Sequence, residues 1–215
     1  MKKLIAIVSS LFLVAITSAK AELGMGVTIA GHMIDGSGKE TTRQSGQVNN
    51  GSHDEKIVVP ELFIEAIGDN GARLGVSYIP TRDVGSKSRS DTNSEGDTGT
   101  YKADAELDDV VQIYVDMPMA QVAGYQTHLK LGVQHVTVST LESLNSGSTY
   151  PNEDLFGLTL GLGVTGDLPY GDGLYYKGEF TYTDFEDLTL HSSAGNKVEA
   201  DLEDFALKFS VGKNF

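Results

Sequence analysis

The chain has 215 residues, a net charge of −14, no cysteine, no tryptophan and 25 glycines. So acidic a chain has no basic surface for a phosphate backbone, which disfavours nucleic-acid binding, and without cysteine it can form neither a disulfide nor a thiolate metal site. Its length fits one domain or at most two. Because only 40% of the residues are hydrophobic, something other than a large aliphatic core must organise the chain.

Residues 1–21 have the pattern of a cleavable secretory signal. Lys2 and Lys3 precede an apolar run, and the small residues Ala19 and Ala21 form a cleavage site before Glu22. We therefore predict a signal peptide at 1–21 and one mature domain at 22–215. No later segment approaches the roughly 18 consecutive apolar residues of a membrane-spanning helix.

The mature sequence alternates apolar and polar residues with a period close to two, which predicts β-strands. Eight strands are expected, each near the ~9 to 11 residues with which a tilted strand crosses a bilayer. They cover residues 23–33, 56–67, 72–82, 106–117, 125–139, 154–166, 174–186 and 202–215.

The connections between these strands alternate between long and short. Strict alternation places all long connections at one end of the sheet and both chain termini at the other, which is typical of an up-and-down barrel. The sequence thus predicts an all-β fold: an eight-stranded antiparallel up-and-down transmembrane β-barrel carrying four acidic, mobile loops. The long connections are residues 35–55, 83–105, 140–153 and 187–201, and the short ones are 68–71, 118–124 and 167–173.

The polar face of each strand indicates which side meets lipid. Between the apolar residues of 154–166 lie small ones, such as Gly157, Thr159 and Gly161, whereas a water-facing exterior would carry large charged side chains. Small residues suit the interior of a narrow barrel. The apolar faces are therefore predicted to point outward. This assignment requires a first short turn with an odd number of residues, with Gly71 in the left-handed conformation.

Strand parity also predicts charged side chains inside the barrel. Both signs occur, so ion pairs can offset the cost of burial. A closed network of such pairs is favoured over a conducting path. The predicted lumen charge network consists of Glu61, Glu65, Arg73, His128, Lys130, Lys177, Glu179 and Lys208, with Asp108, Asp116 and Asp204 on the same interior face.

Aromatic residues gather near the predicted strand ends, where they would form the two interfacial girdles of a membrane barrel. Ordinary strand packing is the alternative explanation, because strands favour aromatic residues in any case. The residues are Tyr78, Tyr114, Tyr125, Tyr170, Tyr175, Tyr176, Tyr182, Phe185, Phe205 and Phe215.

The last strand alternates apolar and polar residues and ends on phenylalanine. Together with the signal and the loop alternation, it resembles the small eight-stranded outer-membrane β-barrel proteins of Gram-negative bacteria, a group that includes the membrane domain of outer-membrane protein A and the opacity-type porin family. The resemblance implies that Leu207, Phe209, Val211 and Phe215 are read by the barrel-assembly machinery. Lys213 stands where the family has an apolar or aromatic residue.

The resemblance also implies a place in the cell. It makes the chain an integral protein of the cell outer membrane, with both termini in the periplasm. Its partners would be outer-membrane lipid and lipopolysaccharide, the barrel-assembly machinery and periplasmic chaperones. A monomer without cofactor or metal is expected.

Three functions fit this reasoning. The first is a structural or surface-recognition role for loops on a lipid-anchored barrel. The second is a narrow porin-like channel for small solutes. The third is an outer-leaflet enzyme that modifies lipid A, for which His135, Thr137, Ser139 and Glu142 are suggestive. Because a hydroxyl two residues from a histidine is common by chance, we expect the chain not to be an enzyme. A soluble periplasmic or secreted barrel is the remaining alternative.

Overall fold

A computed structural model describes residues 21–43, 45–92, 98–143, 149–169, 171–193 and 195–215. Residues 1–20, which include most of the predicted signal, lie outside the described residues, as does Tyr170. Ala21, predicted as the last signal residue, is the first residue of the first strand. Within the described ranges no helix is long and apolar enough to span a membrane.

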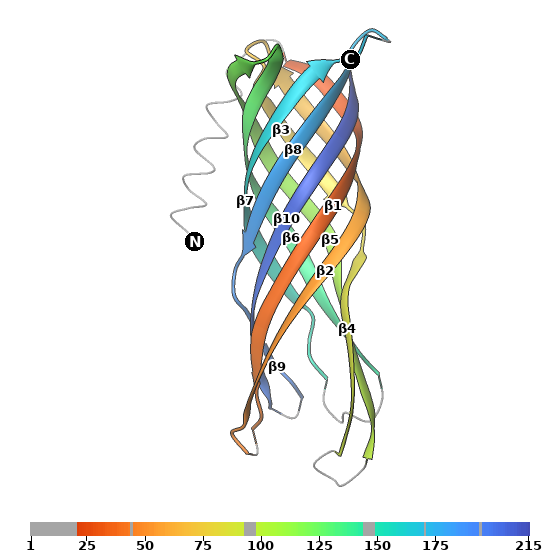
Figure 1. The fold of residues 1–215 in the computed structure, drawn as a ribbon, viewed down its shortest axis with the longest axis vertical. Coiled ribbons are helices and arrows are strands. Elements are labelled where there is room, and N and C mark those ends of the chain that lie inside the picture. The colour runs from red at the N-terminus through yellow and green to blue at the C-terminus, as the bar shows by residue number, and fades with distance from the viewer. Residues whose placement is uncertain (1–20, 44, 93–97, 144–148, 170, 194) are drawn as a thin grey trace.

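The described residues form one antiparallel sheet that closes on itself (Figure 1). Closure runs through β1 and β10, which pair from Gly24↔Asn214 to Thr41↔Lys197. Two barrel strands are interrupted, so β3 with β4 and β8 with β9 each count once, and eight strands make the ring. The predicted fold class is confirmed. The strands are β1 (Ala21–Thr41), β2 (Val48–Gly68), β3 (Arg73–Ile79), β4 (Arg82–Thr92), β5 (Thr98–Val122), β6 (Tyr125–Ser143), β7 (Glu153–Asp167), β8 (Leu174–Phe185), β9 (Leu188–His191) and β10 (Lys197–Asn214).

The tight turns lie at one end of the barrel, which we call the turn end, together with the start of β1 and the C-terminus (Figure 1). The first turn has three residues, 69–71, and Gly71 adopts a φ of 79°. Its N–H donates to the carbonyl of Gly68 at 2.8 Å. The odd-length turn predicted from face parity is therefore confirmed.

The opposite end, which we call the hairpin end, differs from the prediction. The predicted loop at 35–55 is mostly strand, because β1 and β2 stay paired out to Thr41↔Val48. The predicted loop at 83–105 contains β4 and the start of β5, paired to Thr92↔Thr98. Alternation of apolar and polar residues marks a strand only where one face of the strand is apolar. The backbone hydrogen bonds of a ladder form without an apolar face, so alternation gave no signal for these extensions.

Hydrogen bonds link three of the hairpin ends. The Tyr150 hydroxyl donates to Glu40 Oε1 at 3.0 Å, and the Ser193 N–H donates to the carbonyl of Thr149 at 2.8 Å. Glu199 lies 2.8 Å from Lys197 and 3.3 Å from Lys39 on β1. Hydrogen bonds from these two ammonium groups hold the pKa of Glu199 below its ordinary value. These ends are therefore tied together rather than free.

One boundary in the wall lacks a ladder. β2 pairs with β3 only between Leu62↔Tyr78 and Ile67↔Arg73, and within the described ranges no ladder joins β2 to β4. Continued by two residues, this register places Pro60 opposite Pro80, and neither proline has an N–H to donate. The predicted single strand at 72–82 is accordingly interrupted at Pro80. We call the boundary between residues 48–61 and β4 the seam.

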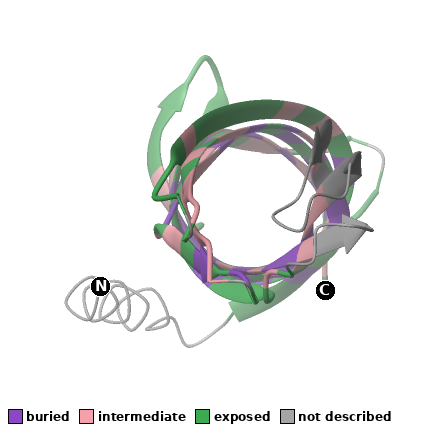
Figure 2. Cartoon of the chain, turned by 90° about the horizontal axis from the view of Figure 1, so that it is seen from below, coloured by how far each residue is buried: buried purple, intermediate pink, exposed green. Residues whose placement is uncertain are grey.

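The outer face of the barrel carries a band of exposed apolar side chains, and seen end-on the ribbon is a closed ring (Figure 2). On β1 the band runs from Leu23 to Met33, which corresponds to about 25 Å along the axis for a strand tilted by about 40°. That is the height of the lipid-facing band of membrane barrels. The predicted outward direction of the apolar faces is confirmed. We call this band the apolar belt.

Candidate functional site

The interior of the barrel is divided along its length. Towards the hairpin end it is filled by an apolar cluster, and towards the turn end by charged and polar side chains. An open water-filled path through a barrel requires a polar lining along its whole length. The apolar cluster consists of Ile34, Val59, Ile79, Leu107, Val110, Val136, Val138, Leu155 and Phe185.

Glu65 is the centre of the charged region and is 1% exposed. Arg73 donates to its Oε1, and Lys177 Nζ lies 2.8 Å from its Oε2. The hydroxyls of Tyr114 and Tyr175 donate to the same carboxylate at 2.7 and 2.8 Å. One carboxylate thus joins strands β2, β3, β5 and β8 across the lumen.

A chain of ion pairs extends from this centre. Lys177 Nζ lies 3.4 Å from Asp116 Oδ2, and Lys130 Nζ lies 2.8 Å from Asp116 Oδ1 and 3.0 Å from Glu179 Oε1. His128 Nε2 lies 2.9 Å from Glu179 Oε1. With Glu65 and Arg73 the region holds three carboxylates and three permanent cations, and these six charges balance.

Asp116, His128 and Glu179 also have the spacing of a metal site, since one ligand atom from each lies within 4.8 Å of the others. The ammonium group of Lys130 bridges the two carboxylates at 2.8 and 3.0 Å. That ammonium supplies the positive charge that a cation would otherwise bring. The three residues are accordingly better explained as part of the ion-pair network.

A second group of charges lies nearer the hairpin end. Lys208 Nζ contacts Glu61 Oε1 at 2.8 Å, His32 Nδ1 contacts Asp204 Oδ2 at 2.8 Å, and His32 Nε2 lies 3.3 Å from Glu61. Arg82 is also buried, with 5% of its surface exposed, and the negative charges of Asp204 and Glu61 favour its positive charge. Its guanidinium has no hydrogen-bond acceptor among the described residues. With Arg82 included, two cations balance two carboxylates.

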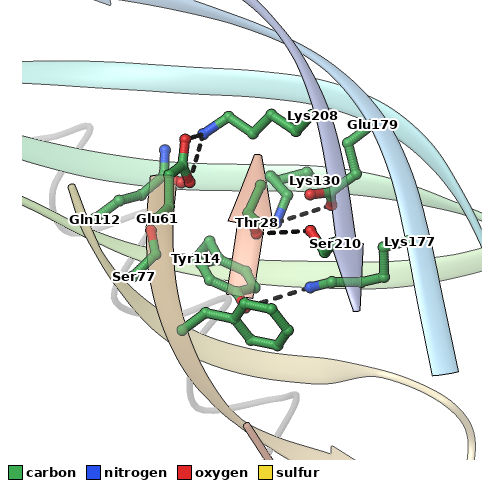
Figure 3. Close-up of a pocket in the computed structure, with 11 residues that line it drawn as sticks. Thr28, Glu61, Ser77, Gln112, Tyr114, Lys130, Lys177, Glu179, Lys208 and Ser210 are labelled. Atoms are coloured by element: carbon green, nitrogen blue, oxygen red, sulfur yellow. Dashed lines mark hydrogen bonds and ion pairs between the residues drawn. The ribbon is translucent and has the colours of Figure 1, made fainter. Parts of the chain in front are cut away.

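Uncharged polar side chains fill the space between the charged groups. Thr28 and Ser210 share a hydrogen bond of 2.7 Å, and Gln112 donates to Thr159 at 2.7 Å. Figure 3 shows side chains from opposite walls meeting across the lumen here. The cavity that they leave measures about 10 Å³, which is about the space that one water molecule needs.

All eight residues of the predicted lumen charge network lie inside the barrel: seven make ion pairs, and His128 forms a hydrogen bond of 2.9 Å with Glu179. Of the three carboxylates predicted on the same interior face, Asp116 and Asp204 join the network. The prediction is wrong for Asp108, because the register shifts between Asp108 and Val111 and Leu107 takes the buried interior position; Asp108 is only half-buried and accepts a hydrogen bond from Ser139 at 2.6 Å. Four interior residues that sequence reasoning missed are His32, Arg82, Tyr114 and Tyr175.

The prediction that Tyr114, Tyr175 and Phe185 belong to aromatic girdles is wrong, because all three are buried in the lumen. Tyr114 lies two residues from Asp116, and Tyr175 lies two residues from Lys177, so each tyrosine is on the same strand face as a lumen charge. The alternation that predicted the charges therefore also indicates that these two rings point inward. Other aromatic residues of the set do point outward and are exposed, namely Tyr78, Tyr125 and Phe215.

Glycines face the rings in the lumen. A Cβ atom at Gly75 would overlap the ring of Tyr114, and one at Gly212 would overlap the ring of Tyr175. At Gly163 the obstacle would be the imidazole of His128. These three interior glycines therefore make room for rings of the network, whereas Gly157 faces Phe185 and Thr183, and Gly161 faces Thr181.

The remaining candidate residues lie apart from the network. Leu207, Phe209 and Phe215 are exposed on the outer face of β10 at its turn-end half, with Val211 half-buried between them. The Phe215 N–H donates to the carbonyl of Leu23 at 2.8 Å, which fixes the last residue of the chain against β1. Their recognition by the assembly machinery stays a prediction, as does cleavage between Ala21 and Glu22.

Of the residues considered for an enzyme, His135 and Thr137 both contact Asp154, Ser139 makes a different contact, and the side chain of Glu142 lies outside the described residues. His135 packs against the ring of Phe156 with centroids 5.0 Å apart, and its Nε2 lies 3.8 Å from Asp154. The Ser139 hydroxyl instead donates to Asp108. This arrangement does not form the hydrogen bond between a histidine and a serine that activates a serine nucleophile.

No family model matches the sequence, and no curated protein is similar to it. Solved structures are similar in fold. The outer membrane protein OprG from Pseudomonas aeruginosa superposes with a TM-score of 0.67 at 14% identity, covering 92% of this chain and 97% of that one. The outer membrane protein AlkL, solved in lipid bilayers, gives a TM-score of 0.50 at 10% identity and 92% coverage of both chains. The chain has the fold of the small eight-stranded outer-membrane β-barrels.

Proposed function

We propose that the protein is an integral outer-membrane barrel that anchors its hairpin end outside the cell and does not conduct along its axis. The apolar belt supports the anchoring, since soluble proteins rarely expose so continuous an apolar surface. The tight turns and both ends of the mature chain lie in the periplasm, because membrane barrels of this type have short periplasmic turns and longer external connections. The hairpins serve a structural or recognition role.

The observation that carries this proposal is the filled lumen. Side chains from opposite walls meet in ion pairs around Glu65 and Glu61, and the cavity among them holds about one water molecule. An ion crossing the barrel would have to break several buried ion pairs, each costly to separate in a medium of low dielectric constant. The narrow-channel alternative therefore requires the network to open.

Conductance measurements test the proposal. Purified protein inserted into planar bilayers is expected to give no unitary current steps, because the network closes the lumen. A variant in which a short turn replaces residues 87–103 should behave in the same way, which excludes the hairpin as the only plug. Steady unitary steps from both proteins would contradict the proposal. Partition into the outer-membrane fraction and heat-modifiable migration on a denaturing gel test the membrane location separately.

The seam supports a second function, the sideways passage of small apolar molecules. The hairpin half of the lumen is filled by the apolar cluster, which a small apolar molecule could displace, the charged region blocks the way to the turn end, and the wall between β2 and β4 has no ladder. A molecule that entered from the hairpin end would therefore leave through the seam into the lipid. Opening this route does not require any ladder hydrogen bond to break at the seam.

A cross-link across the seam tests this second function. His53 on β2 packs where a Cβ atom of Gly85 on β4 would lie, at 2.9 Å, so His53→Cys with Gly85→Cys can be linked in a chain that has no other cysteine. Transfer of an apolar fluorescent probe into vesicles carrying the protein should fall upon cross-linking and recover upon reduction. Each single cysteine variant is the control, and transfer unchanged by the cross-link would contradict sideways passage.

A further inference from the structure

The apolar belt is interrupted by a groove above Gly31, on the outer face of β1. The groove is a cavity of about 370 Å³, lined almost entirely by apolar groups of β1, β2, β8 and β10. Gly31 forms its floor, because a Cβ atom placed there would meet no other heavy atom within 4 Å. Val58 and Leu207, paired to Gly31 on either side, rise from the wall and are 74% and 69% exposed.

Aromatic rings form the wall of the groove on the β8 and β10 side. Phe180 is paired to Leu207, and Phe205 lies next to it with ring centroids 6.4 Å apart. Tyr182 extends this surface, with its ring 4.8 Å from that of Phe205. Because glycine has no side chain and its neighbours carry large apolar ones, the groove fits a hydrocarbon chain running along the barrel.

A lysine stands at the edge of the groove nearest the hairpin end. Lys56 lines the groove and is paired to Met33, in the row of residues directly above Gly31. It is exposed, and no ion pair to it is formed within the described residues. His32 also lines the groove, but its ring nitrogens contact Asp204 and Glu61 in the lumen. The cation available on the outer surface is therefore Lys56.

The next row towards the hairpin end is made of carboxylates. Register places Asp54, Asp35, Glu203 and Asp184 side by side on β2, β1, β10 and β8. All four lie on the outer face, because they share parity with the apolar belt. Successive outward rows are about 6.6 Å apart along a strand. The surface thus presents, in order, a hydrocarbon groove, one ammonium group and a row of negative charge.

We propose that this surface binds one phospholipid with a phosphoethanolamine headgroup. One acyl chain lies in the groove above Gly31, the phosphate pairs with Lys56, and the ammonium group of the headgroup lies against the carboxylate row. The order of charges on the protein is complementary to the order of groups in that lipid. A lipid whose headgroup has the phosphate but no ammonium group, such as phosphatidylglycerol, would leave the four carboxylates without a positive partner. The inference rests on the proposed membrane location and orientation, which put the Lys56 edge of the groove in the outer leaflet, so the lipid bound is one that has reached that leaflet.

Native mass spectrometry of the full chain tests this binding. The protein is released from vesicles that contain equal amounts of phosphatidylethanolamine and phosphatidylglycerol, and a parallel sample contains lipid A. Wild type is expected to retain one phosphatidylethanolamine. Gly31→Leu should fill the groove and reduce retention by roughly tenfold or more. Lys56→Gln should reduce it about fivefold, the effect of one surface ion pair.

Matched variants separate this site from the rest of the belt. Gly178→Leu adds the same side chain at another outward glycine, and Lys213→Gln removes another exposed lysine; neither should change retention. Retention that is equal in all variants would overturn the proposal, and so would a preference for phosphatidylglycerol or lipid A. Failure of the protein to insert into vesicles at all would instead contradict the proposed membrane location, so the two failures are distinguishable.

Discussion

Glu65→Gln is expected to destabilise the folded barrel by about 3–5 kcal/mol, the cost typical of breaking a buried ion-pair network by removing one partner. The variant keeps the shape of the side chain but leaves Arg73 and Lys177 without their shared carboxylate. Its amide nitrogen would also face hydroxyls that now donate to Glu65. Urea titration in lipid vesicles, followed by heat-modifiable gel migration, measures the free energy of unfolding.

Two comparisons make this result specific. Glu153→Gln removes an exposed carboxylate and should change the free energy of unfolding by less than about 0.5 kcal/mol. Combining Glu65→Gln with Lys177→Met removes one unpaired cation together with its partner, so the double variant should be more stable than the sum of the single losses. A Glu65→Gln protein as stable as wild type would show that the network contributes little to the fold.

The charged half of this network was predictable because alternation has a period of two. Once the outward direction of the apolar faces was known, every residue of opposite parity had to point into the lumen. Lys177 and Glu65 lie on strands far apart in the sequence, yet both follow from this rule. Their pairing does not follow, because it depends on the shear that brings residues of β2 and β8 to the same height.

The sequence did not predict three features, because strand parity either conflicted with another preference of the residue or gave no information there. Tyr114 has interior parity, but aromatic residues near strand ends also suit an interfacial girdle. The seam depends on Pro60 and Pro80 meeting in the register, and neither proline alone reveals its partner. The hairpin extensions lie beyond the apolar belt, where both faces of a strand meet water and alternation carries no information.

The phospholipid site, like the seam, depends on residues of different strands that meet only in the register. Gly31 is one of 25 glycines, and parity places it on the outer face of its strand but does not show which side chains stand on either side of it. Only the register shows that it stands between two tall apolar side chains, one row from Lys56 and two rows from the carboxylates. A surface assembled from four strands in this way is visible in the structure and not in any one segment.

Gly75→Ala is expected to destabilise the barrel by about 1–3 kcal/mol, the cost typical of overpacking a filled interior. Alanine is otherwise favoured over glycine in a strand, by about 0.4–1 kcal/mol. At Gly75 the new Cβ atom would overlap the ring of Tyr114. That ring cannot move freely, because its hydroxyl donates to Glu65 at 2.7 Å and its face lies 3.5 Å from the ammonium group of Lys130.

The outward glycine Gly178 provides the matched control for this effect. The nearest atom to a Cβ there is a methyl group of Val164 at 3.7 Å, an ordinary contact, so Gly178→Ala should be neutral or slightly stabilising. Adding Tyr114→Ala to Gly75→Ala removes the ring that is in the way, so the double variant should lose less stability than the two single losses combined. Equal effects of Gly75→Ala and Gly178→Ala in the vesicle titration would show that the rings do not require glycine beneath them. The opposite result would tie Gly75 to the closure of the lumen, because the Tyr114 ring that it accommodates donates a hydrogen bond to Glu65 at the centre of the ion-pair network.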